Sequence, residues 1–439
     1  MNKTSLFILI SHMLLFTLPA PGKAAEQIIS LEDAYRSAIF HSETIAIARE
    51  HLIRSENEVK RMRSFLFPNL KANLDYLRRP RALEGSLGNG NTFTLRSKSQ
   101  TNFNLTLSQP LYTGGRAQAT YREAKLGRTL ERLQLDLSQE DLLFEIAQAY
   151  YAALKAKNNV RIEEKEVERL AAHRRSAEKQ LEVGEVTKTA LLRADAELSD
   201  AQANLIRAKN AVLEAKDQLA LLARLEGPFT LQNPAPVPFF ERTESEWVAI
   251  SHENRLELKQ ENIRIDQATE GIDFARGNFL PSLSLDLQYR WADENPEGSF
   301  LIRNDRLAIL KFEMPIFEGM LSKAELALAR SRLRQSHLEK KRRQDEIASR
   351  VRRARLDLAS LTSELKHLED QVRFAREAFS LASRQFEVGL GTNIEVLDAN
   401  ASLLDAERKY SNALYDREIA ILQIKKESGI FSPLQTPQK

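Results

Sequence analysis

The sequence predicts a mainly α-helical chain that also carries two pairs of membrane-crossing β-strands, arranged as an internal tandem repeat. Three observations predict this fold: turn motifs recur in the same order, long segments lack glycine and proline, and shorter segments alternate apolar with polar residues. The chain has 439 residues, no cysteine and a formal charge of +3. Disulfides and thiolate metal sites are therefore excluded, and the charge balance does not indicate a nucleic-acid partner.

The segment 1–24 predicts a secretory signal peptide. Lys3 precedes an apolar run over 6–18, and the small residues Ala24 and Ala25 follow, which is the order of a cleavable leader. The alternative is a membrane anchor, but this apolar run is too short to cross a hydrocarbon core of about 30 Å as a helix. We expect cleavage after Ala24 or Ala25 and export of the mature chain.

Paired motifs divide the rest of the chain into two copies of one plan. Pro110 and Gly184 of the first copy correspond to Pro315 and Gly389 of the second, and each pair is separated by the same 74 residues. An unchanged spacing over that length indicates one rigid element. We expect a first repeat over 25–230, a linker over 231–245, a second repeat over 246–430 and a tail over 431–439.

The first part of each copy alternates apolar and polar residues with a period of two. In the first such segment, Leu70, Ala72 and Leu74 alternate with polar residues, which places them on one face of a strand. We expect strands at about 69–78, 100–110, 282–292 and 302–314. Stretches rich in Gly, Asn and Pro, at 85–91 and 293–299, are expected to form the turns that join each pair.

Each strand pair ends at a proline corner, Pro110 or Pro315, and leads into a long helical hairpin. The segments that follow are rich in the strongest helix formers and have apolar residues at spacings of three and four, so they should pair as coiled coils. We expect long helices at about 116–183, 187–226, 320–388 and 392–428. Gly184 and Gly389 fall between the helices of each pair, where glycine can take the left-handed conformation that ends a helix.

Alternating strands can form a half-buried sheet on a soluble core or the wall of a membrane β-barrel. Predicted export, strand lengths close to the 9–11 residues that cross a bilayer, and aromatic residues near strand ends favour the barrel. Four strands cannot close a barrel alone, since the smallest have about 8, and an open sheet edge is not stable in lipid. The sequence therefore predicts an oligomer. The alternative is a soluble periplasmic coiled-coil adaptor or scaffold.

A set of motifs covering the mature chain carries a resemblance to a known family. These motifs are the corners around Pro110 and Pro315, the two Val-Gly turns, and the segment 389–399, Gly-Leu-Gly-Thr-Asn-Ile-Glu-Val-Leu-Asp-Ala. In order and spacing they are similar to the TolC family of outer-membrane efflux and secretion channels. The resemblance implies a homotrimer whose twelve strands form an outer-membrane barrel, continued by a barrel of twelve helices through the periplasm.

The resemblance also implies a function and partners. The chain would be a passive exit duct of a tripartite efflux pump or a type I secretion system, with no catalytic residues and no cofactor. Outer-membrane lipid would surround the barrel. A periplasmic adaptor protein would dock at the turns, and an inner-membrane pump or ABC transporter would deliver cargo. The implied docking residues are Val183, Gly184, Val388, Gly389 and Leu390.

In that family an acidic ring narrows the entrance just after the second Val-Gly turn, and Glu395 and Asp398 fall on those positions. Residues three apart share a helix face, so three copies would place six carboxylates around a constriction. Such a ring attracts cations, and mutual repulsion would raise the pKa values of its carboxyls. The chain departs from the family pattern nearby, because Gly391, Phe386 and Ala190 replace an arginine, a tyrosine and an acid that hold the entrance shut.

Three further patterns in the sequence do not indicate a catalytic or ligand-binding site. The glycines between 85 and 90 join two strands and open no helix, as a phosphate-binding loop would. The seven histidines lack the spacing of metal ligands. The basic stretch 340–355 is interspersed with acids, which is typical of a solvated helix face. We therefore expect no enzyme activity and no metal site.

Overall fold

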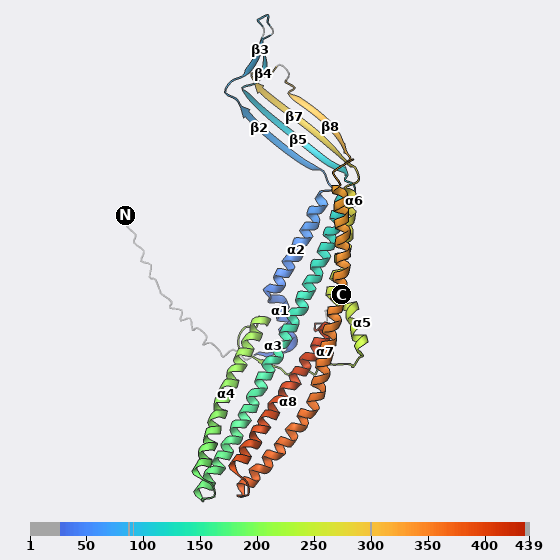
Figure 1. Ribbon diagram of the computed structural model, residues 1–439. Helices are drawn as coiled ribbons and strands as arrows, with labels where there is room; N and C mark the ends of the chain where they lie inside the picture. Colours follow the sequence, from blue (N-terminus) through green and yellow to red (C-terminus); the bar gives the residue numbers. More distant parts are fainter. Residues whose placement is uncertain (1–26, 87, 91, 299–300, 435–439) are drawn as a thin grey trace, which may run out of the picture.

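The computed structural model describes residues 27–86, 88–90, 92–298 and 301–434, so the predicted signal peptide lies outside the described residues. Figure 1 shows an elongated molecule with a β-sheet at one end and two helical turns, side by side, at the other. Long helices connect the two ends. The sheet and the turns are thus separated by most of the length of the molecule.

Four long helices form two hairpins. The first hairpin joins α3 (Arg116–Glu182) to α4 (Lys188–Ala223), and the second joins α7 (Leu321–Glu387) to α8 (Asn393–Glu427). These bounds lie within a few residues of the ranges that the glycine-free and proline-free segments predict. α3 and α7 have 67 residues each, which at 1.5 Å per residue corresponds to about 100 Å.

The four predicted strands form one antiparallel sheet in the order β2-β5-β7-β8. The bounds are β2 Asn69–Arg78, β5 Ser99–Tyr112, β7 Ser282–Asn295 and β8 Asn304–Glu313. Leu70 pairs with Leu107, which pairs with Leu287, so the apolar sets of neighbouring strands fall in register on one face. Lys71, Thr106 and Gln288 are likewise in register on the opposite face. The sheet ends at β2 on one side and at β8 on the other, with open edges in the single chain.

The turn predicted over 85–91 is wrong in its length and its surroundings. Residues Leu83–Ser86 and Thr92–Arg96 form two more strands, β3 and β4, which pair as a hairpin beyond the main sheet. Gly85 lies in β3, where it pairs with Phe93, and a Cβ at this position would lie 2.6 Å from the Phe93 ring. The glycine reflects this close packing and not a reversal of the chain.

Four shorter helices and a small parallel sheet were not predicted. The helices are α1 (Leu31–His41), α2 (Glu43–Ser64), α5 (Glu244–Asn254) and α6 (Leu256–Gly277). α2 and α6 run beside α3 toward the sheet (Figure 1). β1 (Gln27–Ile29) pairs in parallel with β6 (Phe229–Leu231). Each repeat thus has a helix pair before its first long strand.

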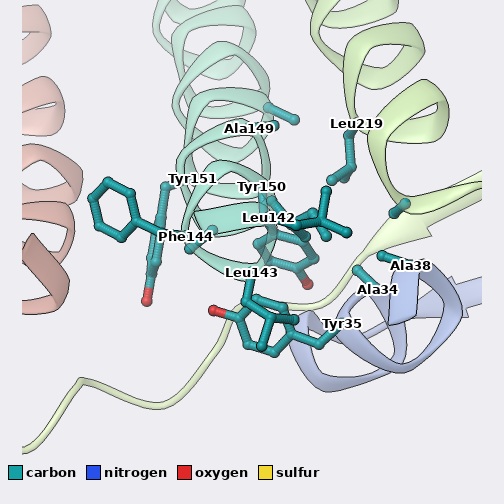
Figure 2. Packing of buried hydrophobic residues seen from close by; sticks show 14 of the residues in the cluster. Ala34, Tyr35, Ala38, Leu142, Leu143, Phe144, Ala149, Tyr150, Tyr151 and Leu219 are labelled. Carbon is teal, nitrogen blue, oxygen red and sulfur yellow. The ribbon is translucent and has the colours of Figure 1, made fainter. Parts of the chain in front are cut away.

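The largest apolar cluster lies midway along the molecule, where α1, α3, α4, β1 and β6 meet. Figure 2 shows Tyr35 of α1, Leu219 of α4 and a run of α3 side chains that includes Tyr150 and Tyr151 packed together. The Tyr150 hydroxyl lies 2.9 Å from the carbonyl oxygen of Ile29 and 2.6 Å from that of Gln232. We call this cluster the midbody core. It holds β1 and the inter-repeat linker against α3.

Candidate functional site

The two hairpin turns lie next to each other and together form the helical tip. Gly184 and Gly389 have φ angles of +79° and +73°, in the left-handed region that the sequence predicts for them. The two turns have equivalent backbone hydrogen bonds. Glu185 N–H donates to the Gln180 carbonyl at 2.8 Å, and Leu390 N–H donates to the Gln385 carbonyl at 2.8 Å. The two repeats therefore end in turns of the same geometry.

Several apolar side chains are exposed at the outer surface of the tip. Val183 is 70% exposed, Val388 68% and Leu390 82%. Ile394, in the first turn of α8, is exposed as well. Apolar side chains gathered at an exposed end and flanked by charged residues are typical of a surface that another protein covers.

Beneath this surface, all four long helices meet in a small apolar cluster. Its buried members are Ala177 of α3, Ala194 of α4, Phe386 of α7 and Val396 of α8. Phe386 is the largest of them and is 1% exposed. Alanines at two of the four positions let the helices approach closely, and the single large ring fills the space between them.

Buried polar groups link the two hairpins at this level. His173 Nε2 of α3 lies 2.6 Å from Asn393 Oδ1 of α8, and Asn393 Nδ2 donates to the Ala190 carbonyl at 3.4 Å. The Gln180 side chain donates to the Phe386 carbonyl. Phe386 and Ala190, which depart from the family pattern, thus take part in contacts that the sequence did not predict.

Further polar pairs continue along the face between α3 and α8, which we call the hairpin seam. The pairs, in the order of their α3 residues away from the tip, are Arg169 with Glu407, Glu166 with Asn400, Glu163 with Arg408, Asn158 with Ser411, and Lys155 with Asp416. Several of these side chains are buried, including Glu163, Glu166 and Asn400. Charged residues at spacings of three on α3 were the signal in the sequence, but the partners lie more than 200 residues away.

The predicted gate residues are exposed near the start of α8. Glu395 closes a capping box with Thr392: its carboxylate accepts from Thr392 N–H at 2.8 Å, and Thr392 Oγ1 accepts from Glu395 N–H at 3.3 Å. These hydrogen bonds with Thr392 lower the pKa of Glu395 within one chain. The direction is opposite to the one that the sequence predicts for a ring of carboxylates from several chains. Asp398 lies one turn further along the same face.

The two proline corners differ from each other. Pro110 lies inside β5, which continues to Tyr112, at a shift in the pairing register with β7. β2 pairs with β5 only as far as Ser108, so Pro110 has a neighbouring strand on one side, a position that tolerates its missing N–H. Pro315 follows the end of β8 and precedes α7. The corner after Pro110 is therefore two residues later than predicted.

No group of acidic, histidine or cysteine side chains in the described part of the chain could hold a metal ion. Among the same residues, no helix has the length and apolar character needed to cross a membrane.

The family model described as outer membrane efflux protein matches residues 34–223 and 247–429, which is most of the chain and one segment in each predicted repeat. The chain belongs to the outer membrane efflux protein family. Members of this family are transport proteins of the outer membrane, and the TolC resemblance is confirmed.

Individual relatives support the assignment of the chain to this family. TolC of Vibrio cholerae is 24% identical over 311 residues, which cover 68% of this chain and 70% of that protein. The alkaline protease secretion protein AprF of Pseudomonas aeruginosa is 24% identical over 339 residues, covering 74% and 69%. A crystal structure of CusC superposes with a TM-score of 0.80 at 18% identity and covers 94% of this chain and 96% of CusC. The fold is therefore that of the efflux family along nearly its whole length.

Proposed function

We propose that three copies of this chain form one continuous exit duct, with a twelve-stranded barrel in the outer membrane and a barrel of twelve helices in the periplasm. The observation that carries the proposal is the sheet of β2, β5, β7 and β8, which has one apolar face, one largely polar face and two open edges. A lipid-facing wall needs the first face, and a water-filled lumen needs the second.

The open edges support the assembly into a trimer. The N–H and C=O groups along β2 and β8 that lack a strand partner could not be hydrated inside a bilayer. Pairing of β8 in one chain with β2 in the next satisfies them, and three chains of four strands close a barrel above the minimum of about eight. The two segments matched by the family model also support the tandem repeat that gives each chain two hairpins.

The helical tip is proposed to receive a periplasmic adaptor protein. Val183, Val388 and Leu390 form an exposed apolar surface that a partner would bury, while Gly184 and Gly389 shape the two turns. An inner-membrane pump or ABC transporter would supply the cargo through that adaptor. The family match gives no support to the alternative that this chain is itself a soluble adaptor or scaffold.

The entrance is proposed to be lined by Glu395 and Asp398, because both are exposed on one face of α8 directly behind the docking surface. The cargo can be a small molecule or a protein. AprF is a secretion protein by name, whereas another relative, BepC of Brucella suis, is an efflux protein by name. Both classes of transport need a duct of this form.

The proposal is tested by locating and weighing the mature protein. Inner and outer membranes are separated, and the native mass of the detergent-extracted complex is measured. A complex of three chains in the outer-membrane fraction is expected. A single chain released with the soluble periplasm would overturn the duct, because the open sheet edges would then need another explanation.

A further inference from the structure

One histidine occupies the point where the four helices of the tip converge. His173 is 7% exposed, and its ring centroid lies 4.8 Å from that of Phe386 on α7. Its Nε2 atom contacts Asn393 on α8, which in turn contacts the Ala190 carbonyl on α4. A single imidazole on α3 therefore contacts the second hairpin directly and connects to both of its helices. We call this group of His173, Asn393 and Phe386 the tip clasp.

The hydrogen bonds of the tip clasp fix the proton on the imidazole. Asn393 donates its amide N–H to the Ala190 carbonyl, so its Oδ1 is left as an acceptor toward His173. Nε2 must then carry the hydrogen, and in the neutral ring Nδ1 carries none. Within the described residues, Nδ1 makes no hydrogen bond to a protein acceptor, so a second proton there would have only water as its partner. A neutral ring with its hydrogen on Nε2 therefore satisfies the contacts of the clasp.

The surroundings do not compensate a positive charge on this ring. Burial lowers the pKa of His173 below its ordinary value of about 6.5, and the hydrogen bond with Asn393 offsets this only in part. Arg175, Lys188 and Glu387 lie within two residues of His173, Ala190 and Phe386 and are exposed to solvent. Other charged groups close in sequence to the clasp are paired elsewhere. These pairs are Arg169 with Glu166 and Glu407, Arg174 with Glu178 and Asp195 of α4, Arg384 with Glu377 on α7, and Glu395 with Thr392 on α8.

We propose that the tip clasp is a proton-sensitive closure: neutral His173 holds the two hairpins together, and protonated His173 releases them. The inference deepens the proposed function, because Asn393 begins α8 and the gate residue Glu395 follows two positions later. Moving the start of α8 away from α3 would carry Glu395 with it. Acid on the side of the helical tip would therefore widen the entrance.

The direction follows from linkage between protonation and opening. A separated tip exposes His173 to water, where its pKa returns to about 6.5. The closed tip binds the proton more weakly, so the closed state is fully favoured above that pH and loses stability as the pH falls below it. If the duct is a trimer, three clasps titrate in each assembly.

The test measures the separation of the turns without relying on transport. Because the chain has no cysteine, Glu182→Cys and Glu387→Cys place spin labels only on the exposed ends of α3 and α7. Labelled chains are diluted with unlabelled ones so that distances within one chain dominate. We expect the label distance in the purified full-length protein to lengthen between pH 7.5 and pH 5.5. An unchanged distance would overturn the clasp.

Two substitutions separate protonation of His173 from general effects of acid. His173→Gln keeps an amide donor toward Asn393 and cannot titrate, so its label distance should stay short at pH 5.5. Asn393→Asp supplies an anionic partner to the imidazolium and should also hold the tip closed in acid. His337→Gln removes an exposed histidine of α7 and should respond as the unsubstituted chain does. A pH response in His173→Gln equal to that of the unsubstituted chain would also overturn the proposal.

Conductance in planar bilayers then connects the clasp to the duct. Acid on the side of the tip should raise the conductance at least twofold in the unsubstituted protein and leave it unchanged in His173→Gln. If the label distance lengthens at pH 5.5 but no conducting pore forms, the proposed duct is wrong and the proposed clasp is still supported. If the protein forms a conducting pore but the label distance does not change with pH, the proposed clasp is wrong and the proposed duct is still supported.

Discussion

The midbody core and the helical tip hold the same long helices together by different means. In the midbody core, Tyr150, Ile146 and Leu154 are fully buried among residues from five helices and two strands. At the tip the buried cluster has two alanines, one valine and Phe386, and polar pairs complete the contact between the hairpins. The midbody core is therefore held mainly by apolar burial, whereas the tip combines a small apolar cluster with polar contacts.

The physical reason is the net free energy of each kind of contact. Apolar burial contributes about 25 cal/mol per Å², and water cannot replace it when the surfaces separate. A polar pair contributes a net of only about 0.5–1.5 kcal/mol, because water satisfies both groups once they are exposed. Opening the hairpin seam should therefore cost far less than opening the midbody core.

The largest effect is expected from Tyr150→Ala. It removes a fully buried ring and leaves the carbonyls of Ile29 and Gln232 without their hydroxyl partner. We expect the free energy of unfolding to fall by about 3–5 kcal/mol, measured by denaturant unfolding of the detergent-solubilised protein. Leu192→Ala, at an exposed position of α4, is the control and should change little. Equal losses in the two variants would contradict a distinct midbody core.

Phe386→Ala should lower stability at the tip but not in the body. The ring fills the space between four helices, so its loss should cost about 3 kcal/mol locally. Hydrogen exchange is expected to accelerate in residues 173–194 and 379–400, while the amides around Tyr150 keep their protection. Phe374→Ala, on the exposed side of the same helix, is the matched control. Faster exchange throughout the molecule would mean that the tip and the body unfold together.

The sequence predicted the regular elements of both regions well and their contacts poorly. The strand expected at 69–78 coincides with β2, because alternation is a local signal. The short helices α1 and α5 also have a local signal, the capping boxes of Ser30 with Asp33 and of Thr243 with Glu246. With 11 residues each, they are too short to stand out by a lack of glycine and proline. The pairing of His173 with Asn393 spans 220 residues. Such a contact depends on how two hairpins dock, which neither local pattern encodes.

Gly184→Val and Gly389→Val test whether the turns at the tip serve docking beyond their role in folding. A β-branched residue at a φ near +75° should cost about 1–2 kcal/mol and distort the turn. We expect loss of export with complexes still present in the membrane fraction. Gly271→Ala, in the middle of α6 with no atom near its Cβ position, is the control and should preserve export. Loss of the complex itself would mean that the two glycines are needed only for folding and assembly.

The smallest effect on stability is expected from Glu395→Gln combined with Asp398→Asn. Gln can keep the reciprocal hydrogen bond with Thr392, so the free energy of unfolding should change by less than about 0.5 kcal/mol. Removing the charges should still weaken the block of conductance by divalent cations, since a ring of carboxylates attracts them. Asp405→Asn, further along α8, is the matched change of charge and should leave the block intact. Unchanged block in the double variant would remove both residues from the entrance, and the tip would then act through docking and the clasp alone.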